Sequence, residues 1–249
     1  MRAGSLPDID AATAGAARDS ERAWRRAQAL SGLALTLFTG VHLVNAMLAA
    51  LPGRYDAFQR VVRVAYQSPV VELLLVALPL LVHVAAGVRA LARRERSTAT
   101  APLRTRLHRW AAWYLLLVIT GHVLATRGTE LLYGVYPESL GLHFAIAWIP
   151  WFFLPYYALL ALGGLYHAAH GTLVALGRLG VRVPSASSAP SRFWPVIALA
   201  SALLLAGIAG MAGWLYAQPD PFASEYAEVY RAMARDGWPV PHVPDARAE

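Results

Sequence analysis

The sequence of 249 residues contains no cysteine and no lysine, and only 15% of its residues are charged. The missing cysteine excludes disulfide bonds, thiolate metal ligands, iron–sulfur ligation and covalent haem attachment through a Cys-x-x-Cys-His motif. The low charge excludes a water-soluble protein, because a chain that is 57% hydrophobic has too few polar side chains to cover its surface. The composition therefore indicates a membrane protein, and any redox or metal chemistry must use its eight histidines.

Five long apolar runs are present, at residues 30–51, 70–92, 110–126, 144–176 and 194–217. A helix needs about 20 apolar residues to cross the ~30 Å hydrocarbon core of a bilayer. We therefore expect an all-α membrane protein with five transmembrane helices in residues 30–217, the fourth long enough to tilt or project. The polar residues 1–29 are expected to form an arm without a signal peptide, and residues 218–249 a tail on the outer surface.

All basic residues are arginines, and these 22 arginines with 15 acidic residues give a net charge of +7. Fifteen arginines lie in the N-terminal arm and in the second and fourth connections, and seven lie on the opposite side. Because basic loops stay in the cytoplasm, this bias predicts a cytoplasmic N-terminus and an external C-terminus. In so apolar a chain, the excess charge fits anionic lipid and not nucleic acid.

Four consecutive spans each carry a histidine within the apolar run, namely His42, His83, His122 and His167. His42 and His122 each lie about 12 residues from the cytoplasmic start of a span, or ~18 Å at 1.5 Å per residue. His83 and His167 lie nearer the cytoplasmic face, on helices that run the opposite way. Depth therefore predicts two histidine pairs at two levels. For any single histidine, a hydrogen bond between helices is an equally good interpretation.

The sequence around these histidines repeats. Residues 39–42 read Thr-Gly-Val-His and residues 120–122 read Thr-Gly-His, while Gly87 and Gly171 each follow a histidine by four residues. Spans one and two therefore look like a copy of spans three and four. A glycine one turn from a histidine either allows close helix packing or leaves room for a flat macrocycle.

Two facing imidazoles without further ligands suit haem b, because the porphyrin supplies the other four nitrogens to the iron. A zinc or di-iron site would need additional ligands near each pair, and Glu72 is the one acidic residue in the second to fourth runs. The pattern therefore predicts two haem b groups. The alternative is a network of hydrogen bonds in a transporter or scaffold.

With these motifs in order, the chain resembles a known family, the five-helix dihaem cytochrome b anchors of succinate:menaquinone oxidoreductases and quinol:fumarate reductases. The resemblance covers about residues 24–217. It rests on four histidines at intervals of 41, 39 and 45 residues, on the glycines beside them, and on Arg178-Leu-Gly180 after the fourth. It implies that the first four spans form a haem-binding four-helix bundle.

The resemblance also implies a role for individual residues. His42 and His122 would bind the haem distal to the cytoplasm, and His83 and His167 the proximal one, with His170 as the rival of His167. Near the cytoplasmic face, the family binds haem propionates at the positions of Gln28, Ser31, His108 and Arg178.

The chain departs from the family at two acidic positions. The glutamate that some members place two residues before the fourth ligand, linked to transmembrane proton movement, is Leu165 here, so no such path is expected at that position. The outer glutamate proposed to accept quinol protons has no clear counterpart. Glu72 is the candidate for this quinone-linked proton transfer, and Asp56 and His143 are the alternatives.

The function implied by the resemblance is electron transfer between an iron–sulfur partner subunit and menaquinone, in a bacterial cytoplasmic membrane. The chain has no cysteine for iron–sulfur clusters and no Gly-x-Gly-x-x-Gly flavin loop, so the flavoprotein and iron–sulfur subunits would be separate chains. Dicarboxylate chemistry would lie on those subunits, and the complex could dimerise through the fifth span. The alternatives are a cytochrome b subunit of a hydrogenase or formate dehydrogenase, and a non-redox scaffold or transporter subunit.

Overall fold

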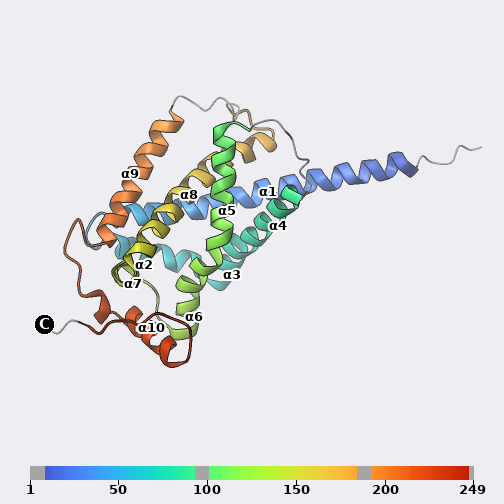
Figure 1. Cartoon of the computed structure of the whole chain (residues 1–249). Coiled ribbons are helices and arrows are strands. Elements are labelled where there is room, and N and C mark those ends of the chain that lie inside the picture. Colours follow the sequence, from blue (N-terminus) through green and yellow to red (C-terminus); the bar gives the residue numbers. More distant parts are fainter. Residues whose placement is uncertain (1–8, 93–100, 184–191, 247–249) are drawn as a thin grey trace, which may run out of the picture.

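The computed structural model describes residues 9–92, 101–183 and 192–246, which are mainly helical and contain no β-strand (Figure 1). Five stretches are long and apolar enough to cross a membrane: Gly15–Leu48, Pro69–Ala92, Leu103–Tyr133, Pro150–Arg178 and Phe193–Met211. Large apolar side chains on them are exposed, including Leu117 at 80% and Trp151 at 79%, as expected for surfaces that contact lipid. The predicted all-α, multi-pass membrane architecture with five spans is confirmed.

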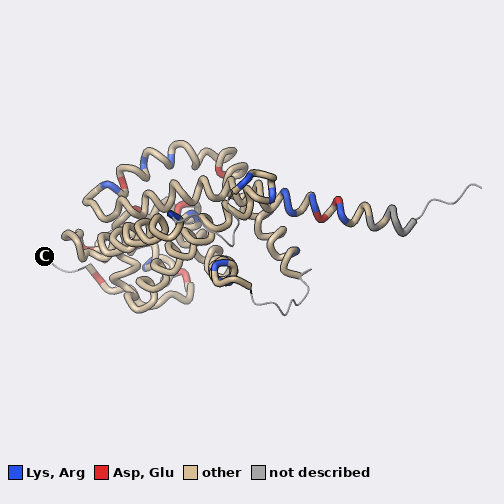
Figure 2. Tube along the Cα trace, turned by 90° about the horizontal axis from the view of Figure 1, so that it is seen from above, with Lys and Arg blue, Asp and Glu red and all other residues tan. Residues whose placement is uncertain are grey.

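Helix α1 (Ile9–Leu48) is a single helix of 40 residues whose N-terminal part projects beyond the other helices (Figure 1). Charged residues mark this projecting part, whereas the long helices elsewhere are mostly uncharged (Figure 2). Ion pairs between residues three or four apart, Arg22–Asp19 at 3.7 Å and Arg25–Glu21 at 3.0 Å, support the exposed helix. From Ile9 onward, the expected polar arm is therefore a helical continuation of the first span; residues 1–8 lie outside the described residues.

The second and third spans each contain a π-helical turn. The second is built from α3 (Pro69–Glu72), η1 (Leu73–Ala77) and α4 (Leu78–Ala92). The third is built from α5 (Leu103–Val123), η2 (Leu124–Gly128) and α6 (Thr129–Tyr133). The sequence prediction that this span ends at residue 126 is wrong, because the helix continues through η2 and its charged residues there are paired.

The fourth apolar run is divided into α7 (Ser139–Trp148) and α8 (Pro150–Arg178). Pro150 has no N–H to continue the hydrogen bonds of α7, and Ile149 leaves the helical conformation with φ −135° and ψ 72°. The expectation that residues 144–176 form one helix is therefore wrong, although α8 alone, with 29 residues, is still long enough to tilt or project. Part of the run forms a separate helix at one end of the molecule.

The C-terminal tail folds against α7. It contains the 3₁₀ turn η3 (Pro221–Ala223) and α10 (Glu225–Arg235). Phe144 of α7 is fully buried against Tyr226, Ala227 and Val243 of the tail. Trp148 Nε1 also donates a hydrogen bond of 2.9 Å to a tail carbonyl, that of His242. We call this end of the molecule the α10 end, and the opposite end the Arg178 end.

Helices α1, α4, α5 and α8 carry the four histidines and contact one another through α1 and α8. Helix α1 contacts α8, α4 and α9 (Phe193–Met211), and α5 contacts α8. Gly207 and Gly210 of α9 lie directly on the backbone at the C-terminal end of α1 and just after it, where any side chain would overlap the carbonyl oxygens of Ala46 and Ala49. Backbone contact therefore fixes α9 on α1. Helix α2 (Arg54–Tyr66) joins the first two spans at the α10 end.

Candidate functional site

Two histidine pairs lie between the long helices. The ring centres of His42 on α1 and His122 on α5 are 6.0 Å apart, and the ring planes make an angle of 72°. The ring centres of His83 on α4 and His167 on α8 are also 6.0 Å apart, at 90°. The structure thus brings together the two pairs that helix direction and depth select from the sequence.

Three of these four imidazoles have a partner at Nδ1. His83 Nδ1 lies 3.2 Å from the backbone oxygen of Gln28, and His167 Nδ1 lies 3.5 Å from that of His108. A carbonyl oxygen only accepts hydrogen bonds, so Nδ1 carries the proton in both rings and Nε2 keeps its lone pair. His122 Nδ1 lies 3.4 Å from the Tyr156 hydroxyl. Histidines that bind a metal through Nε2 commonly have such a hydrogen-bond partner at Nδ1.

The glycines in the motifs of His42 and His122 face open space. A Cβ atom added to Gly40 or Gly121, which lie beside these histidines in the sequence, would meet no atom of the described residues within 4 Å outside its own helix turn. The His42 side chain is itself exposed, although it lies well inside a span. The bare surface that these two glycines leave is therefore not filled by protein.

The His83–His167 pair is surrounded by side chains instead. A Cβ atom on Gly32 would lie only 3.0 Å from His83 Cε1, and one on Gly171 would lie 3.3 Å from His108 Cε1. Here the glycines allow neighbouring rings to approach the helix backbone. Close packing is therefore seen at the His83–His167 pair, whereas the glycines beside His42 and His122 in the sequence face open space.

His170 occupies a packed position beside this pair. His108 lies flat against His167, with ring centres 4.3 Å apart and planes at 4°, and His170 lies 5.1 Å from His108. His170 is 1% exposed, stacks on Tyr166, and its Nδ1 has no hydrogen-bond partner among the described residues. His167, and not His170, is therefore the histidine of α8 that lies opposite His83.

The residues expected near haem propionates meet at the Arg178 end. Arg178 Nη1 donates a hydrogen bond of 2.7 Å to Gln28 Oε1, which joins the end of α8 to α1. The Ser31 hydroxyl is buried and donates to the Ala27 carbonyl of its own helix at 2.7 Å. Gln28, His108 and Arg178 thus lie around the His83–His167 pair, whereas the Ser31 hydroxyl bonds within α1.

A network of ion pairs lies at the α10 end. Arg127 donates to both carboxylate oxygens of Glu72, each at 2.9 Å, and lies 2.7 Å from Glu130. Arg63 and Gln67 each donate to Glu130 at 3.2 Å. Glu72, the candidate for proton transfer, is therefore held in a two-pronged ion pair that ties α3 to η2. Glu130 lies beyond the predicted end of the third span and was not expected in the site; its three-residue spacing from Arg127 is the sequence signal that indicates the pair.

Aromatic side chains connect this network to His42. Phe38 stacks on His42 with ring centres 6.0 Å apart and meets Tyr66 edge-on at 5.6 Å. The Tyr66 hydroxyl lies 3.1 Å from that of Tyr136, and Arg63 lies 3.7 Å above the Tyr136 ring. Burial and the hydrogen bond to Tyr136 raise the pKa of Tyr66 above its ordinary value. Tyr66 therefore stays neutral at physiological pH, between the histidine pair and the ion pairs.

The two alternatives to Glu72 make structural contacts. Asp56 accepts hydrogen bonds from the backbone N–H of Ser139 at 2.8 Å and from its hydroxyl at 2.5 Å, which holds the first turn of α7 against α2. His143 Nδ1 lies 2.8 Å from the Met211 carbonyl oxygen and joins α7 to the end of α9. Both side chains thus position helices at the α10 end.

No model of a protein family matches this chain, and no similar protein is found among curated proteins or solved structures. Within the described residues, no three or more His, Asp or Glu side chains are grouped so that they could hold a metal ion by themselves. The two histidine pairs and their surroundings are therefore the features of this chain that indicate a function.

Proposed function

We propose that this chain is the membrane-anchoring cytochrome b subunit of a succinate dehydrogenase or fumarate reductase complex, which passes electrons between an iron–sulfur subunit and menaquinone. The observation that carries the proposal is the equal 6.0 Å spacing of two histidine pairs. An imidazole nitrogen binds a first-row metal at about 2 Å and lies roughly 1 Å from its ring centre, so two rings on one iron have centres roughly 6 Å apart. Both pairs fit this spacing.

The other geometric features of the pairs are compatible with this interpretation. Two imidazoles that hold one haem need no fixed angle between their ring planes, so the angles of 72° and 90° would both be suitable. Each pair supplies two ligands, which suffices for haem b and not for a metal ion bound by protein alone. When bound, each haem would accept and release one electron at a time. In this proposal α1, α4, α5 and α8 form the haem-binding bundle.

The chain's own residues would orient the two ligand pairs. The carbonyl oxygens of Gln28 and His108 hold His83 and His167 in the tautomer that leaves Nε2 available. The Tyr156 hydroxyl has the corresponding place beside His122. At the Arg178 end, the Arg178 guanidinium would bind propionate carboxylates through charge-assisted hydrogen bonds, with the side chains of Gln28 and His108 nearby.

The absence of cysteine indicates which partner subunits the chain would need, and the distribution of its arginines indicates where they would dock. Without cysteine, the chain needs an iron–sulfur subunit and a flavoprotein as separate chains, which would dock at the Arg178 end on the cytoplasmic side of a bacterial membrane. Menaquinone would react at the α10 end, near the His42–His122 pair. Glu72 could take a proton there only if Arg127 released its carboxylate, because that guanidinium holds both oxygens.

The test is purification of the chain from cells with full haem supply, followed by haem quantification and identification of co-purifying subunits. The proposal expects two haem b groups per chain, together with a flavoprotein and an iron–sulfur protein. A haem-free preparation would contradict it and favour a scaffold or transporter subunit. Two haem groups with hydrogenase or formate dehydrogenase subunits would keep the haem sites and reassign the complex.

A further inference from the structure

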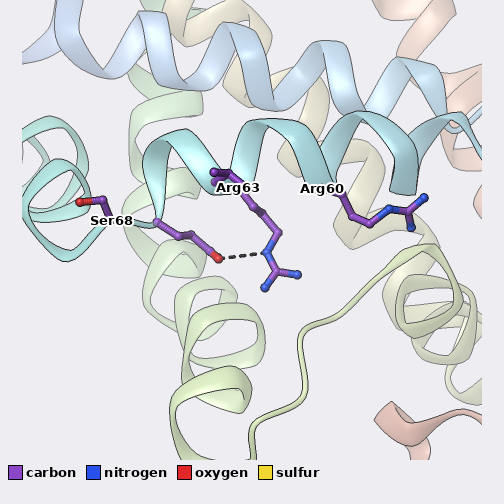
Figure 3. A pocket seen from close by; sticks show the side chains of 5 residues that line it. Arg60, Arg63 and Ser68 are labelled. Atoms are coloured by element: carbon purple, nitrogen blue, oxygen red, sulfur yellow. Dashed lines mark hydrogen bonds between the residues drawn. The ribbon is translucent and has the colours of Figure 1, made fainter.

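A cavity of about 300 Å³ lies beside α2 at the α10 end. Its lining residues come from the second half of α2 and the turn that follows it: Arg60, Arg63, Val64, Gln67 and Ser68. Figure 3 shows the Arg60 and Arg63 side chains leaving the same side of α2, with Ser68 near the end of the helix. The cavity thus combines two guanidinium groups with an amide and a hydroxyl.

The position of α2 in the chain sets the depth of this cavity in the membrane. Helix α2 follows the end of the first span at Leu48 and is followed directly by the second span, which begins at Pro69. It therefore lies at the membrane surface and not at the midplane. Its outward face is apolar, since Val61 is 73% and Val64 is 84% exposed. A helix with exposed valines and arginines suits the boundary between acyl chains and headgroups.

The charges around the cavity favour an anion. Arg63 is held by Gln67 at 2.9 Å, by Glu130 at 3.2 Å and by the ring of Tyr136. Arg60 is exposed and makes no hydrogen bond or ion pair with any residue that the structure describes. The cavity therefore has the Arg60 guanidinium, which has no partner among the described residues, and the Arg63 guanidinium, whose position is fixed. Such planar groups with several donors match phosphate oxygens closely.

We propose that this cavity binds the phosphate group of an anionic phospholipid. Arg60 and Arg63 would donate to the phosphate oxygens, and the acyl chains would lie along Val61 and Val64. The two exposed valines favour a lipid over free phosphate, because free phosphate would leave this apolar face uncovered. The site does not depend on haem or on the proposed electron transfer.

The test measures lipid binding by the full chain in detergent, by native mass spectrometry with phosphatidylglycerol or phosphatidylcholine added. One arginine near anionic headgroups contributes about 1 kcal/mol, so Arg60→Gln should weaken phosphatidylglycerol binding roughly fivefold. The matched control is Arg54→Gln, which removes the same charge from the exposed start of α2, outside the cavity, and should leave binding unchanged.

Three outcomes would overturn the proposal. The first is unchanged phosphatidylglycerol binding in Arg60→Gln, and the second is an equal loss in Arg54→Gln, which would indicate general surface charge. The third is displacement of phosphatidylglycerol by inorganic phosphate at equal concentration, which would indicate a free-phosphate site. Because Arg60 has no partner within the described residues, its substitution should leave the thermal unfolding midpoint of the lipid-free protein unchanged.

Discussion

The His42–His122 and His83–His167 pairs have the same ring spacing and different surroundings. Backbone carbonyl oxygens lie at both Nδ1 atoms of the His83–His167 pair, and the His108 ring packs flat on His167. The His42–His122 pair has a phenol at one Nδ1, an aromatic ring stacked on His42, and neighbouring glycines that face open space. Spacing is therefore set by how the helices pack, whereas the environment of each pair is set by side chains about one turn away.

This separation means that each pair can be changed without changing the other. The pairs lie on four different helices, and among the described residues no side chain or carbonyl group makes a ring contact or hydrogen bond with both pairs.

Loss of a proposed ligand should have the largest effect. We expect His122→Ala and His167→Ala each to lower the haem content from two groups per chain to one, because haem b has no covalent attachment. The remaining α-band should differ between the two variants in reduced-minus-oxidised spectra. His170→Gln is the matched control on α8 and should retain both haems. Haem loss in His170→Gln with retention in His167→Ala would reverse the ligand assignment.

Larger side chains in place of Gly121 and Gly171 should distinguish the open space at one glycine from the packed surroundings of the other. Gly121→Leu should remove haem from the His42–His122 pair while the haem-free chain keeps its stability, since a Cβ atom at this position meets no neighbouring side chain within 4 Å among the described residues. Gly171→Leu should also lower the stability of the haem-free chain, by about 1–3 kcal/mol, because it would overlap His108. Haem quantification and denaturant unfolding measure the two effects. Equal destabilisation by both substitutions would remove the contrast between the pairs.

Breaking the ion pair beside the His42–His122 pair should reduce stability moderately. Glu72→Gln should cost about 1–2 kcal/mol, because Arg127 loses a two-pronged partner in a setting only about one quarter exposed, where the side chains are 24% and 26% accessible. A double-mutant cycle with Arg127→Gln, followed by denaturant unfolding, isolates the coupling between the two side chains. If Glu72→Gln instead abolished quinone turnover at unchanged stability, the carboxylate would have a catalytic role.

Removal of the phenol next to His122 should have the smallest effect. Tyr156→Phe deletes a hydrogen-bond partner of Nδ1, which makes the imidazole less basic and the oxidised iron less favoured. We therefore expect a small upward shift in the midpoint potential of one haem, and none in the other, in a redox titration. Tyr157→Phe removes the neighbouring hydroxyl and serves as the control. A shift of both haems in Tyr156→Phe would point to a general structural change.

Much of this arrangement could be predicted from the sequence because it depends on local rules. Apolar run length identifies spans, and the fixed rise of a helix converts residue number into depth, which was enough to select the partners of His42 and His83. The surroundings of each pair could not be predicted. They depend on which face of each helix meets its neighbour, and this places His108 against His167 and Tyr156 beside His122.

The errors also have physical causes. The third span appeared to end at residue 126 because Arg127 and Glu130 are charged, yet their charges are paired with Glu72 and with each other. The fourth run appeared continuous because Pro150 lies among apolar residues, although a proline at that position begins a new helix. The average hydrophobicity of a run shows neither the ion-pair partners of Arg127 nor the helix boundary at Pro150.

The unbroken course of α1 determines how its projecting part is oriented. Arg18 precedes His42 by about 24 residues on one helix, which is ~36 Å along the axis. Anything bound to the projecting arginines would therefore have its direction set by helical phase and not by a flexible joint. Inserting a single residue between Arg18 and Gln28 would turn that surface by about 100° relative to the histidines while lengthening the helix by only about 1.5 Å.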